Sequence, residues 1–359
     1  MDQAERKETA QQAIVYVGVA VAVVIVLVLL WYAIDVVLLA FLGVLLAILL
    51  RAPADWLIAR FGWAERWSFA LVVAVFLLLV VGGAALFGRG IAVQALQLVD
   101  RIPEIVETFK TQLGESELGA RAVALIESSG MLAGGESQFL GRGLGLIGST
   151  FGAVANVLIV FFFAVFMAAR PEPYVEGVLF LVARKRRSRV REVLYEIGHV
   201  LRRWLVGQSL LALCVAVLTA GGLLLLGAPF AVALALLAGL MEFVPYIGPF
   251  VAAIPAILVG FGEGPELALK IALLFFAIQL TESYVLAPLV QHRAVYLPPA
   301  AILFSQVLMG TVVGALGVAV ATPLAAAAMV ALSMLYVEDA LGDKNAKPQP
   351  EASPARKSR

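Results

Sequence analysis

The chain has 359 residues, of which 62% are hydrophobic and 14% are charged, and its formal net charge is +1. A soluble domain carries about 25% charged residues, so the composition excludes an ordinary soluble protein and predicts an all-α membrane protein with about 6 to 8 spans. One cysteine and two histidines exclude an intrachain disulfide and a histidine-rich metal site. We therefore expect no metal and no cofactor.

The first half of the chain contains four apolar stretches that predict membrane-spanning helices, and residues 1–87 form the first unit. Asp35 is expected at a tight turn between the first two. Pro53 is expected to end the second, which at about 22 Å is short and could continue past Arg51. Residues 51–67 combine arginines with three tryptophans, which predicts an amphipathic turn on the cytoplasmic side. The expected spans are residues 14–34, 36–50, 68–87 and 150–169.

Residues 88–148 differ from the rest because they hold seven acidic and five basic residues. Spaced apolar positions predict a small extracytoplasmic helical lobe, interrupted at Pro103 and followed by a weaker helix over 117–127. The lobe is either a subunit contact or a solvated loop with amphipathic helices, and both interpretations stay open.

Residues 149–204 hold the fourth span and a strongly basic loop. Eight basic residues lie between 184 and 203, against Glu192 and Glu196, which places this loop in the cytoplasm. The sequence has no aromatic platform beside it, so anionic lipid headgroups are favoured as its partner and nucleic acid is not expected. The N-terminus is then also cytoplasmic and the lobe faces outward.

Residues 205–337 begin with a fifth span at 205–226 and continue into an interrupted apolar stretch at 230–260. Its middle reads Met241-Glu242-Phe243-Val244-Pro245-Tyr246-Ile247-Gly248-Pro249. Prolines remove backbone donors and break a helix, and a broken helix beside a carboxylate at membrane depth is a common transporter site. The stretch is either a re-entrant hairpin or one kinked span. A packed kink with Glu242 at the interface is the structural alternative.

The next span, residues 266–288, carries Gln279 and Glu282 on one helical face. Ionisable residues inside the membrane normally face a cavity or a partner, so Glu282 is the best candidate for proton or cation coupling. The alternative is a structural hydrogen bond to a broken helix end.

Residues 300–337 are too long for one ordinary span and are interrupted around Gly310 to Gly317, which predicts a second broken hairpin. The polar tail, residues 338–359, is expected to be disordered and cytoplasmic. The residues predicted to line the substrate or ion pathway are Glu242, Pro245, Tyr246, Gly248, Pro249, Pro255, Gln279, Glu282, Pro288, Gly314, Gly317 and Pro323.

Three of these stretches resemble the signature of the autoinducer-2 exporter family of bacterial membrane proteins: Glu242 to Pro249 with Ile254-Pro255-Ala256, Gln279 to Pro288, and Gly310 to Leu324. The resemblance is specific from about residue 203 to 336. It implies efflux of small polar molecules across the inner membrane by a homo-oligomer, a pentamer, with a transport site in each protomer and elevator-like movement. Ser283, Tyr284 and the pair His292-Arg293 depart from the pattern and leave the substrate open.

Two other functions stay open beside the exporter. Some relatives are associated with sodium–proton exchange, so the first is a cation/proton antiporter that uses Na⁺ or H⁺. The second is a non-transporting membrane scaffold in which the lobe at 88–148 is the working part. An enzyme is not expected, because the sequence shows no nucleophile–base set and no metal motif at the membrane boundary.

Overall fold

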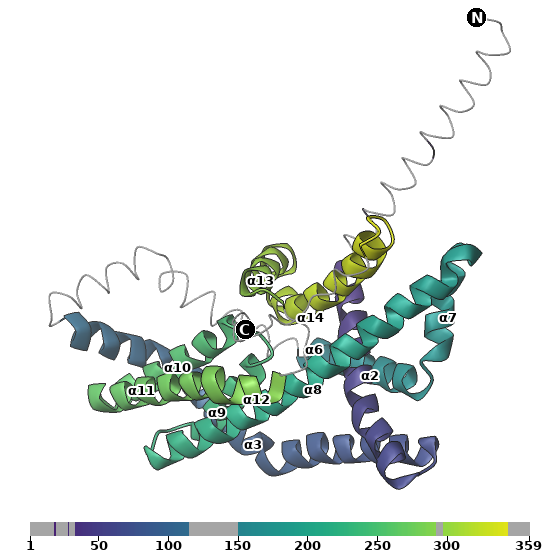
Figure 1. The fold of residues 1–359 in the computed structure, drawn as a ribbon. Helices are drawn as coiled ribbons and strands as arrows, with labels where there is room; N and C mark the ends of the chain where they lie inside the picture. Colours follow the sequence, from purple (N-terminus) through teal and green to yellow (C-terminus); the bar gives the residue numbers. More distant parts are fainter. Residues whose placement is uncertain (1–17, 19–27, 29–32, 115–149, 292–296, 344–359) are drawn as a thin grey trace, which may run out of the picture.

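The structure, a computed structural model, describes residues 18, 28, 33–114, 150–291 and 297–343 (Figure 1). Every regular element within these ranges is a helix. Five helices are long and apolar enough to cross a membrane, or six if one bent pair counts as a crossing. The predicted polytopic all-α fold is confirmed. The first expected span, at 14–34, lies largely outside the described residues.

Helix α2 (Ile34–Phe61) is longer than the second expected span. Asp35 was expected at a tight turn before this helix, but it lies in the first turn of the helix. The positive end of the helix dipole stabilises a carboxylate there. The prediction that Pro53 ends the helix is wrong, because α2 continues to Gly62, whose φ is 67°. A proline removes one helix hydrogen bond. The flanking Ala52 and Ala54 are both buried, and their packing helps to offset the lost hydrogen bond.

Helix α3 (Glu65–Gly114) is a continuous helix of 50 residues that contains the third expected span. It passes through residue 88, where the sequence predicts the lobe to begin. The predicted interruption at Pro103 is wrong, because the helix continues through it to Gly114. A proline removes one helix hydrogen bond, which the other hydrogen bonds of a 50-residue helix outweigh. The lobe beyond Gly114, including the helix expected at 117–127, lies outside the described residues and stays a prediction.

Helix α6 (Thr150–Ala169) coincides with the fourth expected span. The chain then turns by 92° into α7 (Glu172–Phe180). The basic segment at 184–203 is helical, which corrects its prediction as a loop. It forms a short 3₁₀ turn, η1 (Arg184–Arg186), and the first half of α8 (Arg187–Leu225). Ion pairs at helical spacing, such as Arg189–Glu192 at 2.8 Å, stabilise that half.

Three spans are tied together at the ends that carry the arginines. Arg51 of α2 binds Asp55 at 3.1 Å and the Ala168 carbonyl of α6 at 2.9 Å, and it also contacts Glu65. Arg202 of α8 binds the same Asp55 at 2.7 Å. These contacts hold α2, α6 and α8 at one level, so the basic half of α8 and the aromatic turn after α2 lie at the same end of the molecule.

The remaining helices form two hairpins around a nearly continuous span. In Figure 1, α9 to α12 lie beside one end of α8, and α13 and α14 lie above it. The elements are α9 (Ala231–Met241), α10 (Ile247–Glu263), α11 (Pro265–Thr281), η2 (Glu282–Leu286), α12 (Ala287–Gln291), α13 (Pro299–Val313), α14 (Ala315–Leu332) and η3 (Ser333–Glu338).

Helices α9 and α10 form a hairpin and not one kinked helix. Leu234 near the start of α9 packs with Ala256 and Val259 near the end of α10, in a cluster with Leu223 at the end of α8. Ala238 and Ala252, nearer the break, pack together beside Val215. The open end of this first hairpin therefore lies at the Leu225 end of α8, and its tip lies further along α8 toward the basic half.

The second hairpin, α13–α14, points the opposite way. Ala326 and Val330 of α14 pack with Leu201 and Leu205 of α8, and Leu297, just before α13, contacts the same cluster. The open end of the second hairpin therefore lies near the basic half of α8, and its tip at Gly314 points toward the other end. The two hairpins enter from opposite ends and overlap in the middle.

Candidate functional site

The tip of the first hairpin is a short strained turn. Helix α9 ends at Met241, and Tyr246 adopts φ 66° and ψ −49° before α10 begins. The Ile247 amide donates to the Pro245 carbonyl at 2.8 Å, which closes a three-residue γ-turn of the rare positive-φ kind. Such a backbone conformation costs about 1–3 kcal/mol and is found where the surrounding structure enforces it.

Gly248 permits the chain to return this tightly. Its amide donates to the Val244 carbonyl at 2.8 Å. A Cβ atom built on Gly248 would overlap the backbone carbonyl of Met241. Pro249 follows in the first turn of α10, where the missing amide hydrogen has no helical partner to lose. The glycine and the prolines thus shape the break, as the sequence predicts for them.

Two buried glutamines from other helices hold the tip. Gln208 of α8 donates from Nε2 to the Glu242 carbonyl at 2.5 Å. Gln306 of α13 donates from Nε2 to the Pro245 carbonyl at 2.8 Å, and so it connects the two hairpins. These side chains are 2% and 0% exposed. Neither was named from the sequence, although each is a polar residue in an apolar stretch, the same signal that singled out Gln279.

Two carboxyl groups meet beside this tip. Glu242 is 3% exposed, and its side chain lies within hydrogen-bonding reach of Glu282. Gln279 donates to Glu282 at 3.1 Å, and Gln208 lies 3.4 Å from the Glu242 carboxyl. A hydrogen bond between two carboxyl groups needs one proton, because two carboxylates are both acceptors. A hydrogen-bonded pair of this kind therefore holds one proton between its two carboxyl groups.

Glu282 begins a π-helical turn, η2, which interrupts the span formed by α11 and α12. Its own carbonyl accepts a hydrogen bond from the amide of Ala287, five residues on. A π-turn widens the helix locally, and such turns are frequent at functional sites. Both carboxyl groups therefore lie at interruptions of regular helix, one at a hairpin tip and one at a π-turn.

The second hairpin turns at Gly314, which has φ 77° and ψ −149°. A Cβ atom at Gly317 would overlap the Met309 carbonyl, and one at Gly310 would lie 2.9 Å from Val318 Cγ2. These contacts set the register of the hairpin, which buries Gln306 on α13 and Thr322 on α14. Both side chains are buried, and within the described residues the Gln306 Oε1 and Thr322 Oγ1 atoms have no hydrogen-bond partner.

The other predicted pathway residues form no hydrogen bond with the carboxyl pair in the described part of the chain. The Tyr246 side chain is 45% exposed, although its backbone forms the turn. Pro255 lies inside α10 and Pro323 is buried inside α14. Pro288 is exposed on α12. The structure thus brings together Glu242, Pro245, Gly248, Gln279 and Glu282 at one place.

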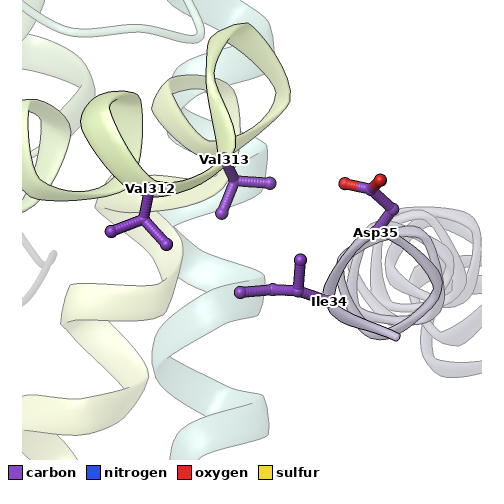
Figure 2. Close-up of a pocket in the computed structure, with 4 residues that line it drawn as sticks. All are labelled: Ile34, Asp35, Val312 and Val313. Atoms are coloured by element: carbon purple, nitrogen blue, oxygen red, sulfur yellow. The ribbon is translucent and has the colours of Figure 1, made fainter. Parts of the chain in front are cut away.

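A separate cavity of about 250 Å³ lies beside the tip of the second hairpin. Figure 2 shows Ile34 and Asp35 at the start of α2 facing Val312 and Val313 at the end of α13. It is not next to Glu242, and Asp35 was not predicted to line a pathway. Within the described part of the chain, no three His, Cys, Asp or Glu side chains gather as a metal site requires.

The sequence is similar to proteins of a known family. Residues 20–336 match the model of a family described as the AI-2E family transporter. Two Bacillus subtilis proteins, "Putative transport protein YrrI" and "Putative transport protein YueF", are each 26% identical over 54% and 49% of the chain. The matches cover 56% and 49% of their lengths, so the chain spans about half of each. "Putative transport protein MT0215" of Mycobacterium tuberculosis is 27% identical over 79% of the chain and 78% of its own length. This chain belongs to the AI-2E transporter family.

Proposed function

We propose that this membrane transporter exports a small polar molecule, of the autoinducer-2 type or a related solute, through a core built from the two hairpins. The observation that carries the proposal is the buried Glu242 at the first hairpin tip, in reach of Glu282 and held by glutamines from α8 and α13. Oppositely directed broken helices that meet at a polar centre are the usual construction of a secondary transporter site.

The geometry supports a re-entrant first hairpin. The 11 residues of α9 rise only about 16 Å, which is too short to cross a hydrocarbon core about 30 Å thick. With the basic half of α8 in the cytoplasm, the first hairpin enters from outside and the second from inside. On this orientation we propose that both termini lie in the cytoplasm and that the protein lies in a bacterial inner membrane.

A cation/proton antiporter is the second candidate, and the carboxyl pair favours it. One proton satisfies Glu242 and Glu282, and a Na⁺ ion that displaces the proton would find oxygen ligands in both side chains. A site that binds Na⁺ and releases a proton on one side of the membrane, and does the reverse on the other side, is an antiporter. The same pair can couple solute export to the proton gradient, so both candidates use the same two residues.

The test is transport by the full chain in proteoliposomes, with Glu282→Gln compared against the native protein. Labelled autoinducer-2 flux and the response of a pH-sensitive dye to a sodium pulse are followed together. Glu266→Gln is the matched control, because it makes the same change at the exposed start of the same span, where Glu266 only pairs with Lys270.

Sodium-driven proton movement that is lost in Glu282→Gln and kept in Glu266→Gln establishes the antiporter. Solute flux without any ion response supports the exporter and reduces Glu282 to a binding or structural group. Absence of both activities in well-folded native protein contradicts the proposal.

A further inference from the structure

Two apolar stripes lie side by side on α7 and the two residues that follow it, and one of them is largely exposed. Val175 and Leu179, with Val182 just after the helix, recur at helical spacing toward the protein, and Leu179 is 1% exposed. The adjoining stripe, Tyr174 and Val178 with Leu181 just after the helix, is 37%, 47% and 86% exposed, and one edge of it is the Tyr174 ring, which packs against Phe163 of α6. Apolar side chains that recur on an outer face in this way indicate a surface with a partner.

The direction of α7 suits a helix that lies along a membrane surface. It follows the span α6 after a 92° turn, so it runs nearly in the bilayer plane if α6 crosses the bilayer. It begins at the level of Arg51, which binds the Ala168 carbonyl near the end of α6. It is therefore located where a spanning helix leaves the hydrocarbon.

The apolar stripe is followed at once by free positive charge. Phe180, at the end of α7, is 77% exposed, and Arg184, Lys185 and Arg186 follow in η1. Among the described residues, these three basic side chains form no ion pair. The acidic residues nearby are taken by other arginines: Glu176 by Arg191, Glu196 by Arg203, and Glu192, Glu338 and Asp339 by Arg189.

We propose that α7 and η1 form an interfacial anchor that binds anionic phospholipid: the stripe of Tyr174, Val178 and Leu181 enters the headgroup boundary, and Arg184, Lys185 and Arg186 contact the phosphates. Interfacial helices combine an apolar face with basic residues in this way. The anchor would hold the start of α8, and with it the open end of the second hairpin, at a defined depth. It is independent of the transported solute.

The anchor is tested by hydrogen exchange of residues 172–187 in the full chain, in nanodiscs of neutral phosphatidylcholine and in nanodiscs with added phosphatidylglycerol. The variant Arg184→Gln/Lys185→Gln/Arg186→Gln removes the three charges. The matched control is Arg356→Gln/Lys357→Gln/Arg359→Gln, which replaces the same residue types in the C-terminal tail. A third variant, Val178→Ser/Leu181→Ser, removes the apolar stripe and keeps the charges.

We expect phosphatidylglycerol to slow exchange in the native chain and in the tail control, and high salt to weaken the effect. Each basic residue strengthens association with an anionic surface about fivefold, so the triple change weakens it on the order of 100-fold and abolishes the slowing. The variant Val178→Ser/Leu181→Ser is expected to lose most of the slowing by phosphatidylglycerol. Inorganic phosphate added to neutral nanodiscs is expected to have no effect.

Equal exchange in the two lipids, or loss of the lipid effect in the tail control as well, overturns the proposal. Slowing by inorganic phosphate alone would make the basic cluster a phosphate site. A change in the mass of the assembly in the stripe variant would make this face a contact between copies of the chain. Either result would show that this face binds a ligand other than the anionic lipid, and would overturn the proposal.

Discussion

The backbone is tightly packed around Gly248 at the first hairpin tip. We therefore expect Gly248→Ala to lower the stability of the protein, although it adds only one methyl group. The added Cβ would overlap the backbone carbonyl of Met241. A backbone carbonyl cannot rotate away as a flexible side chain does. The turn must therefore open, which moves the Pro245 carbonyl from Gln306 and the Glu242 carbonyl from Gln208.

The expected magnitude comes from overpacking. Forcing extra volume into a packed site costs about 1–3 kcal/mol, and a strained hydrogen bond at the tip adds about 0.5–1.5 kcal/mol. For 359 residues, an unfolding entropy of about 2.1 cal/mol/K per residue means that 1 kcal/mol moves the melting temperature by about 1.3 °C. We therefore expect the midpoint of thermal unfolding to fall by about 2–6 °C.

The assay is thermal unfolding of the purified full chain in one detergent, together with transport in proteoliposomes. Gly82→Ala is the matched control, since a Cβ there meets nothing within 4 Å. In a helix interior that change is expected to be neutral or to stabilise by about 0.5–1 kcal/mol. If Gly248→Ala melts at or above the temperature of Gly82→Ala, the tip is not closed as described and the reasoning fails.

Other changes test single contacts, each by the unfolding midpoint of the purified chain. Gln306→Leu leaves the Pro245 carbonyl without its side-chain donor and is expected to cost about 1–3 kcal/mol; an unchanged midpoint would contradict a role for this contact in joining the hairpins. Arg51→Gln is expected to cost about 1–3 kcal/mol, because its partners on α2 and α6 lose a charged donor. Lys270→Gln removes an exposed, solvent-screened pair and is expected to leave the unfolding midpoint unchanged. Tyr246→Gly relieves a positive φ and is expected to leave stability unchanged or raise it by about 1 kcal/mol; a clear loss would show that the tyrosine ring stabilises the tip.

Some expectations failed for one common reason. Pro53 and Pro103 both lie inside continuous helices, and the basic segment before the fifth span is helical. In each case a local signal for a break is weaker than the stability of the helix on both sides. A single proline removes one hydrogen bond, whereas a proline, a glycine and a carboxylate within a few residues, as at 242–249, do end the helix.

The candidate site illustrates the same limit. Glu242, Gln279 and Glu282 are visible in the sequence as polar residues in apolar spans. The sequence does not show that they lie side by side, because that depends on how a hairpin packs against a helix some forty residues further along the chain. Gln208 and Gln306 were open to the same criterion, yet their role follows only from the two carbonyls they satisfy.

The sequence alone determined the class of protein, most of the helices and the places where the hairpins break, because span length, missing amide donors and positive φ are local properties of the backbone. Only the tertiary structure decided that the hairpins point in opposite directions, that the two carboxyl groups meet and that two distant glutamines hold the tip. Those features depend on which buried polar groups find partners, and in an apolar environment the partner comes from whichever helix packs against the break.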